Sequence, residues 1–338
     1  MLKYIVKRLL MLIPVLIGVS IIVFVLLRVF AADPAPVVLG EHADAAAMDA
    51  WREEQGLNDP IIEQYWDFVT GAVTGDFGES YYTQTPVFDE IMARFPATIE
   101  LAIVAIIIAS VLGIVIGVIT AVKKNTIVDN LGMFISLIGI SVPIFWLGVM
   151  MQILFGKMLG WLPVQGASDA DVLFDKVTGS YFIDSLISGD MSNFANVLWH
   201  MILPACTLAF YTMAIVSRMT RSSMLDTLNQ DYIRTARAKG LAEGRVIRRH
   251  ALRNALMPIV TVIGLQFGSL LGGAVLTETV YGWPGMGKYL VECVQKSDFP
   301  VVQSAVLLIA VIFVVLNLLV DLLYAFLDPR IKYGRKEA

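Results

Sequence analysis

Long apolar runs alternate with polar stretches along the 338-residue chain. The first run, Leu9–Leu27, carries no charge and would rise about 28 Å as a helix, close to the hydrocarbon thickness of a bilayer. We expect five further spans, at about residues 97–122, 127–155, 197–216, 257–280 and 301–327. The pattern therefore predicts an all-α polytopic membrane protein with six transmembrane helices. A cleaved signal peptide is the alternative for the first run, but the run is too long for one.

The stretch from residue 31 to residue 96 has the composition of a soluble segment. It holds thirteen acidic residues against two basic ones, Arg52 and Arg94. Two helices are expected within it, Ala45–Gln55 and Pro60–Val73, the second with Tyr65 and Phe68 on an apolar face. The segment either caps the membrane domain or docks an external partner. We accordingly expect three parts: 1–30 with the first helix, an extracytoplasmic segment 31–96, and a permease core 97–338.

The distribution of charge predicts the orientation of the spans. Hydrophobic residues make up 57% of the chain and charged residues 16%, with a net charge of −4. Basic residues gather at 3–8, 123–124, 231–253 and 330–336, whereas 31–96 and 161–196 are acidic. Short loops rich in Lys and Arg stay in the cytoplasm. We therefore expect both termini inside a multi-pass cell-membrane protein. Cys206 and Cys293 form neither a disulfide framework nor a metal-ligand spacing.

The basic stretch from Asp231 to Pro258 is the least membrane-like part of the second half. Asp231 can cap a short helix and Gly240 suits its end, where a left-handed conformation is favoured. At helical spacing Tyr232, Ile233 and Ala236 share a small apolar face. That face could seat in a groove of another protein. The alternative is a solvated basic loop that only sets the topology.

The order of residues in this stretch resembles the cytoplasmic EAA loop of ABC-importer permeases, in the form found in the dipeptide/oligopeptide/nickel family. The matching strings are RTARAKG, HALRNA and the following Pro258, with Gly240 as the motif glycine. GDFG at 75–78, RFPATIEL at 94–101 and TETVYGWPGMGKYL at 277–290 also look like this family. The first EAA position is Arg234, and Pro258 lies further from Gly240 than in the general pattern. The resemblance implies a type I importer permease fold with a coupling loop at 218–256.

The resemblance also implies function, site residues and partners. The chain would form half of a translocation pathway for dipeptides or oligopeptides, with nickel, glutathione and haem as alternative solutes. Its partners would be a second homologous permease, one or two cytoplasmic ATPase subunits that carry ATP and Mg, and an extracytoplasmic substrate-binding protein. The chain itself would be non-catalytic, without cofactor, metal or nucleic acid. The expected ATPase-coupling residues are Asp231, Tyr232, Arg234, Thr235, Ala236, Arg237, Lys239, Gly240, His250, Arg253 and Asn254.

Five residues are candidates for the pathway. Ser141, Pro143 and Trp146 belong to the string SVPIFWLG, where proline breaks a helical hydrogen bond. Glu278 belongs to the TETVYGWPG string, and Asp321 is an acid inside an apolar run. An intramembrane acid indicates function by default. Because Asp321 lies near the inner end of its run, we favour a hydrogen bond between helices over a proton relay.

Three other functions fit the sequence less well than an importer permease. Gly282–Lys288 spells the phosphate-loop pattern G-x-x-x-x-G-K, but Tyr289 stands where Ser or Thr must hold magnesium. An intramembrane hydrolase would need paired catalytic residues, and His200 and Asp321 fall near opposite sides of the membrane. A secondary transporter would show internal repeats, and none is evident.

Overall fold

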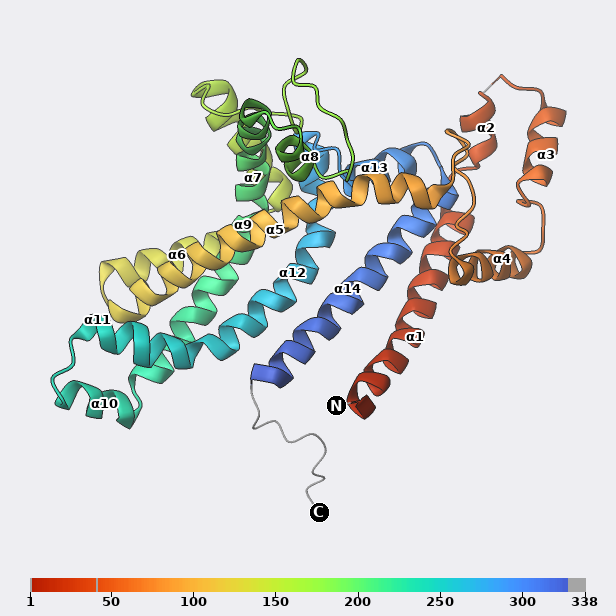
Figure 1. The fold of residues 1–338 in the computed structure, drawn as a ribbon. Helices are drawn as coiled ribbons and strands as arrows, with labels where there is room; N and C mark the ends of the chain where they lie inside the picture. Colours follow the sequence, from red (N-terminus) through yellow and green to blue (C-terminus); the bar gives the residue numbers. More distant parts are fainter. Residues whose placement is uncertain (1, 41, 328–338) are drawn as a thin grey trace.

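The computed structural model describes residues 2–40 and 42–327, and the regular secondary structure in these ranges is helical apart from one isolated β-bridge (Figure 1). In chain order the helices are α1 (Leu2–Val25), the π-helix η1 (Leu26–Phe30), α2 (Pro34–Leu39), α3 (Ala45–Glu54), α4 (Ile61–Thr74), α5 (Val87–Val122), α6 (Ile127–Ser141), α7 (Ile144–Met151), η2 (Gln152–Met158), α8 (Tyr181–Ile187), α9 (Met191–Leu228), α10 (Asp231–Ala238), α11 (Glu243–Arg245), η3 (Val246–Leu252), α12 (Arg253–Tyr281), α13 (Met286–Gln295) and α14 (Phe299–Leu327).

The apolar helices confirm the expected all-α, six-span architecture. Five helices in the described ranges are long and apolar enough to cross a membrane, and a sixth span is a broken pair. That pair, 127–141 and 144–158, bends by 108°. The continuous third span that we expected, with only a proline bend, is therefore wrong. Pro143 cannot donate a backbone hydrogen bond and restricts Val142 to an extended conformation, which ends α6 and starts α7.

Two span boundaries also differ from expectation. α5 begins at Val87, ten residues before the expected start, with Asp89 and Glu90 in its first turn where the helix dipole favours acids. Pro96 is accommodated inside it. α9 continues to Leu228 instead of ending near residue 216. Its last turns bury Thr220 and Met224, so packing keeps this polar stretch helical.

The centre of the fold is the contact between α5 and α9. Small residues recur every fourth position on α5, at Ala105, Ala109, Gly113 and Gly117. A Cβ atom added to Gly117 would lie 2.5 Å from Thr220, and one added to Gly113 would lie 2.9 Å from Val216. Small residues thus let the two helices approach closely, as they do in membrane interfaces generally. α12 and α14 complete this layer.

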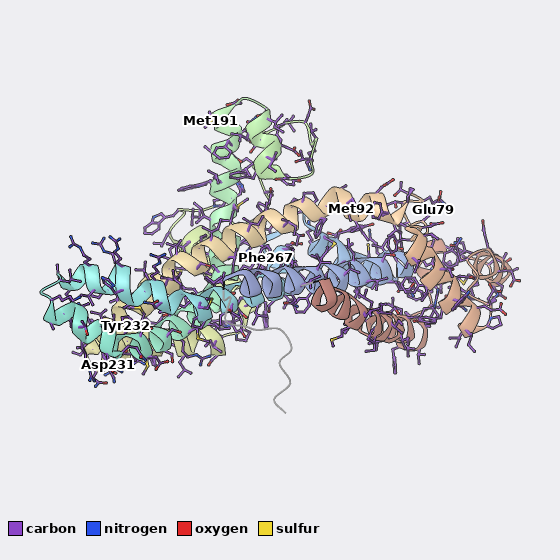
Figure 2. All side chains as sticks on the ribbon, turned by 60° about the horizontal axis from the view of Figure 1, so that its bottom comes forward. Glu79, Met92, Met191, Asp231, Tyr232 and Phe267 are labelled. Atoms are coloured by element: carbon purple, nitrogen blue, oxygen red, sulfur yellow. The ribbon has the colours of Figure 1, made fainter. Side chains whose placement is uncertain are left out.

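The fold has two chemically different ends. Figure 1 shows α10, α11 and the α5–α6 turn at one end, with the described termini of α1 and α14 toward the same side. We name this the basic end. The other end carries α2–α4, the 159–190 connection with α8, and α13, and we name it the acidic end. Figure 2 labels Asp231 and Tyr232 at the first and Glu79 at the second. The basic C-terminal segment after residue 327 lies outside the described residues.

The expected helices at 45–55 and 60–73 are confirmed as α3 and α4. α4 lies against α1, where the Tyr65 hydroxyl is 2.9 Å from Ser20 Oγ and the Tyr65 ring packs edge-on to Phe24. The short helices α2, α8 and α13 were not predicted. α2 and α8, with six and seven residues, are too brief to show a hydrophobic period.

Candidate coupling surface and central cavity

A short helix and a left-handed turn form the basic end. α10 begins at Asp231 and ends before Gly240, whose φ of +72° is the conformation that we expected there. The Gly240 N–H bonds to Arg237 O at 2.9 Å and the Leu241 N–H to Ala236 O at 3.4 Å, which is a Schellman ending. Nothing lies within 4 Å of a Cβ at Gly240, so the glycine is needed for its backbone angle and not for space.

The apolar face of α10 is covered by the chain itself. Ile233 is fully buried and Ala236 is 7% exposed. Both belong to a cluster with Met224 at the end of α9, Val246 in η3 and Ile259 in α12. Ile233 and Ala236 therefore pack inside the chain, whereas Tyr232, the third residue of the expected face, is 44% exposed. Docking of α10 into a partner's groove stays a prediction. α9, η3 and α12 together fold into a cradle that buries Ile233 and Ala236.

The opposite face of α10 is exposed and charged. Asp231 does not cap the helix, since its carboxylate lies 3.5 Å from Arg234 Nη1 and points outward. Arg237 forms a two-pronged ion pair with Glu243 across the Gly240 turn, at 3.1 and 2.6 Å. Tyr232, Thr235 and Lys239 are also exposed. We name the exposed residues of α10 and Lys239 the coupling surface.

The remaining expected coupling residues follow in η3 and the start of α12. His250 is partly buried, whereas Arg253 and Asn254 are exposed. Asn254 Nδ2 donates to His250 O at 2.6 Å within the helix. The structure brings all eleven predicted residues to one end of the molecule, nine of them exposed, with Ala236 facing inward and His250 partly covered.

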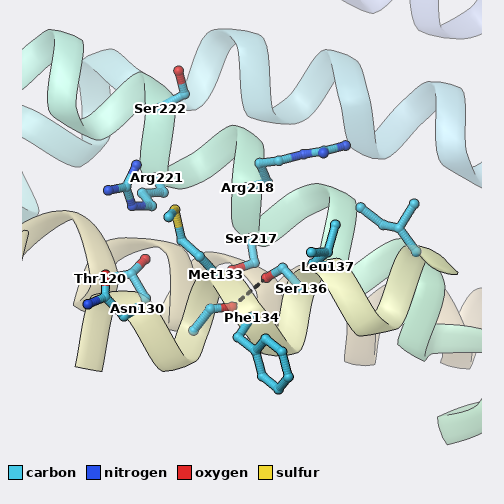
Figure 3. A pocket seen from close by; sticks show the side chains of 12 residues that line it. Thr120, Asn130, Met133, Phe134, Ser136, Leu137, Ser217, Arg218, Arg221 and Ser222 are labelled. Carbon is cyan, nitrogen blue, oxygen red and sulfur yellow. Dashed lines mark hydrogen bonds between the residues drawn. The ribbon is translucent and has the colours of Figure 1, made fainter. Parts of the chain in front are cut away.

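An ion pair that the sequence did not indicate fastens the basic end. Arg221 on α9 donates to both carboxylate oxygens of Asp129 on α6, at 2.6 and 2.8 Å. Asp129 is 1% exposed and also accepts from the Asn125 N–H at 2.9 Å. The two residues lie 92 positions apart, so no local pattern could join them. Beside them α6 and α9 enclose a side cavity of about 540 Å³, lined by Arg218, Ser136 and neighbouring residues (Figure 3).

A larger cavity of about 970 Å³, which we name the central cavity, opens at the break between α6 and α7. Ser141 and Pro143, two of the five pathway candidates, line it. Its other walls come from α1, α9, α12 and α14, including Tyr211, Thr212 and Phe313. Glycines 268, 272 and 273 on α12 line one wall, beside Ser269 and Leu270. The lining is mostly apolar with a few hydroxyl groups.

Two other pathway candidates, Trp146 and Glu278, lie elsewhere. Trp146 on α7 is 48% exposed and is not among the residues that line this cavity. Glu278 is fully buried at the acidic end, where its Oε2 accepts the Lys288 N–H at 3.0 Å. The loop wraps it so closely that a Cβ at Gly285 would lie 2.5 Å from its carboxyl group. Asp321 falls on α14, but its side chain is outside what the structure describes.

Two helices connect the coupling surface with the central cavity. α9 contributes Leu208, Tyr211 and Thr212 to the cavity and ends two residues before α10. α12 starts directly after η3 and contributes Gly268 to Gly273. At 1.5 Å per residue, roughly 24 Å of continuous helix separates Thr212 from Leu228. A displacement of the coupling surface would therefore reach the cavity through rigid elements.

The described residues offer no metal centre, because no three His, Cys, Asp or Glu side chains among them lie close enough to hold an ion. His200 contacts Asp169, with Nε2 to Oδ1 at 3.4 Å, and bonds through Nδ1 to Asn196 O. Cys206 and Cys293 are both free.

Known proteins similar to this chain cover 98 to 99% of its length. Residues 113–333 match the family described as binding-protein-dependent transport system inner membrane component, and residues 1–102 match the corresponding N-terminal family. A dipeptide transport system permease protein of Alkalihalophilus pseudofirmus is 48% identical over 98% of this chain and all of its own length. A di/tripeptide permease of Pseudomonas aeruginosa is 44% identical over 99% of this chain and all of its own.

A more distant relative and one solved structure are also similar to this chain. A glutathione transport system permease protein of Escherichia coli is 42% identical over 98% of this chain and its own full length. The inward-facing methionine ABC transporter MetNI aligns with a TM-score of 0.49 and 16% identity, over 69% of this chain and 93% of that one.

Proposed function

The chain belongs to the family of binding-protein-dependent transport system inner membrane components, and from this premise we propose that it forms half of the translocation pathway of an ATP-driven dipeptide importer. Relatives named as dipeptide or di/tripeptide permeases, 44 to 48% identical over their full length, support the solute class. The chain is the membrane subunit, and ATP binds to and is hydrolysed on separate cytoplasmic subunits.

The observation that supports the proposal is that α9 and α12 each connect the coupling surface to the central cavity. Each of these helices supports the coupling surface at the basic end and lines the central cavity farther along. Closure of the ATPase subunits on α10 would push both helices as rigid levers. The cavity at the α6–α7 break would then alternate between inward and outward access.

The proposal sets the orientation and the partners. The basic end faces the cytoplasm, because positive loops resist translocation, so both termini are cytoplasmic. A second homologous permease supplies the other half of the pathway. The substrate-binding protein docks at the acidic end and delivers the solute.

Transport in proteoliposomes tests this function. The purified complex is reconstituted with ATP inside and the binding protein and labelled L-alanyl-L-alanine outside, while the membrane potential is held constant. We expect uptake only with ATP and binding protein together. Uptake that persists without ATP would identify a secondary transporter instead. Competition by unlabelled glutathione reports on the second solute class, and we expect it to be weaker than competition by a dipeptide.

Exposed residues of the coupling surface provide the sharper test. Arg234→Ala removes a side chain that is 74% exposed and forms an ion pair with Asp231 on its own helix. We expect the variant to assemble with fewer ATPase subunits and to lose most ATP-driven uptake. Lys124→Ala is the matched control, since it removes one exposed charge from the α5–α6 turn at the same end. Equal uptake by both variants would contradict the coupling role of α10.

A further inference from the structure

The acidic end contains a second polar cavity that the proposed pathway does not use. It measures about 350 Å³ and lies between the α3–α4 segment and the adjacent ends of α1 and α14. Its floor comes from Arg28 in η1 and Gln303 in the first turns of α14. Its rim comes from the α3–α4 connection, α4 and the 75–81 loop. A π-helical turn such as η1 often marks a functional position.

The floor carries hydrogen-bond donors without acceptors. Nε and Nη1 of Arg28 are buried, and neither bonds to any described residue. The guanidinium group packs instead on two rings, 5.5 Å from the Phe24 centroid and 5.1 Å from that of Phe299. Gln303 is 4% exposed, and its Nε2 is likewise unpaired among the described residues. Burying such groups unpaired costs free energy that a matching ligand would recover.

The donor set specifies an anion of planar shape. A guanidinium group presents its N–H bonds as a rigid fork that fits a carboxylate with two parallel hydrogen bonds. Stacking between Phe24 and Phe299 holds the Arg28 fork in place. Gln303 adds a neutral amide donor on the same floor. A carboxylate that reached these buried donors would find them already held in place.

The rim specifies a cation. Asp59, Asp67, Asp76 and Glu79 are exposed and line the cavity. None of the four forms an ion pair with a described residue. They are not a metal site, because no three acidic side chains in the described ranges converge closely enough to hold an ion. Carboxylates spread around an opening suit an ammonium group better than a compact divalent ion.

We propose that this cavity binds a small zwitterionic peptide, with the α-carboxylate on Arg28 and Gln303 and the α-ammonium group toward the acidic rim. A volume of about 350 Å³ lies in the range of small-molecule sites and exceeds what one ion needs. The identification of the zwitterion as a peptide rests on the proposed function. The cavity is then a receiving site for the solute on the acidic side of the permease.

Binding to the full-length chain in lipid nanodiscs tests the site directly. Calorimetry with L-alanyl-L-alanine is run on the wild type, Arg28→Met and Gln303→Leu. We expect Kd to rise at least tenfold for Arg28→Met and less for Gln303→Leu. Amidating the peptide's carboxyl terminus should weaken wild-type binding as strongly as Arg28→Met does, and N-acetylation should weaken it independently of Arg28.

Stability distinguishes a ligand seat from a structural arginine. Since Nε and Nη1 of Arg28 are buried without an acceptor among the described residues, Arg28→Met should leave the melting temperature of the free chain unchanged or raised. A lowered melting temperature would assign Arg28 to the fold and overturn the proposal. Arg52→Met is the matched control. Arg52 lies in α3 at the same acidic end, pairs with Asp33 and Asp49, and does not line the cavity.

Two further results would overturn the site, and two others separate it from the proposed function. L-alanyl-L-alanine binding that is absent, or equal in wild type and Arg28→Met, refutes it. So does an Arg28→Met defect seen only in docking of the binding protein, which would assign the cavity to a protein contact. ATP-driven uptake without Arg28-dependent binding leaves the importer standing and removes the site. Arg28-dependent binding without ATP-driven uptake does the reverse.

Discussion

The acidic end and the basic end of this protein are each stabilised by a different kind of contact. At the acidic end buried carboxylates tie loops to helices through backbone N–H groups: Glu100 accepts from Phe182 at 3.0 Å, Asp184 from Thr178 at 2.9 Å, Glu278 from Lys288 at 3.0 Å and Asp298 from Tyr81 at 3.2 Å. Each of these carboxylates is at most 8% exposed. At the basic end α10 rests on an apolar cradle, and its charges face outward.

The difference teaches how one chain can be rigid at one end and movable at the other. Hydrogen bonds from a carboxylate to backbone N–H groups are directional, so the acidic-end loops have one permitted position. Apolar contacts are not directional, so the cradle itself fixes no single orientation of α10, and the specific side-chain tie from α10 to α11 is the exposed Arg237–Glu243 pair. The buried Asp129–Arg221 pair is the exception at the basic end.

Truncating Ile233, the side chain that packs α10 on its cradle, should have the largest effect on stability. Ile233 is fully buried, and Ile233→Ala should lower the free energy of unfolding by about 3–4 kcal/mol through lost burial and a residual cavity. Thermal unfolding of the purified chain in detergent measures the change. Ile233→Val is the control, with an expected loss of about 1 kcal/mol. Equal stability of wild type and Ile233→Ala would mean that α10 is not packed on its cradle.

Breaking the basic-end ion pair should come next. Arg221→Ala leaves the Asp129 carboxylate without its two guanidinium bonds, and we expect a loss of about 2–3 kcal/mol. Replacing both residues, Asp129→Leu with Arg221→Met, should recover most of that stability, since no buried charge is then left alone. A double variant that is no more stable than Arg221→Ala would contradict this account.

Loosening an acidic-end tie should cost less. Glu278→Gln keeps the shape of the side chain and one acceptor for the Lys288 N–H, so we expect a loss of about 1 kcal/mol, whereas Glu278→Ala should lose about 2–3 kcal/mol. Hydrogen exchange should show faster opening of the 282–285 turn and the first residues of α13 in Glu278→Ala. Unchanged exchange in that segment would show that Glu278 does not hold it.

The smallest stability effect should belong to the coupling surface. Arg234→Ala and Tyr232→Ala alter exposed side chains, so the free energy of unfolding should change by no more than about 0.5 kcal/mol. ATP-driven uptake should nevertheless fall sharply in Arg234→Ala, which separates it from Ile233→Ala, where stability and uptake fall together. A destabilised Arg234→Ala protein would remove the distinction between the two faces of α10.

Much of this protein follows from the sequence alone. The apolar runs predicted six spans, and α3, α4 and the Gly240 turn lie where local patterns predicted them. The strings around Arg234–Gly240 and Thr277–Leu290 indicated the importer family, to which the chain belongs. These features depend on residues close together in the chain, where helical period, turn propensity and motif order carry the information.

The tertiary structure alone decided how these elements are used. The apolar face of α10 is buried by its own chain, and a sequence shows the same face whether its cover is internal or a partner. Pro143 predicted a distortion, but the 108° bend depends on which helices α6 and α7 pack against. Asp129 and Arg221 are 92 residues apart, and Arg28 and Gln303 come from opposite ends of the chain. Helical periodicity specifies a face, and only the packing of distant segments determines what that face meets.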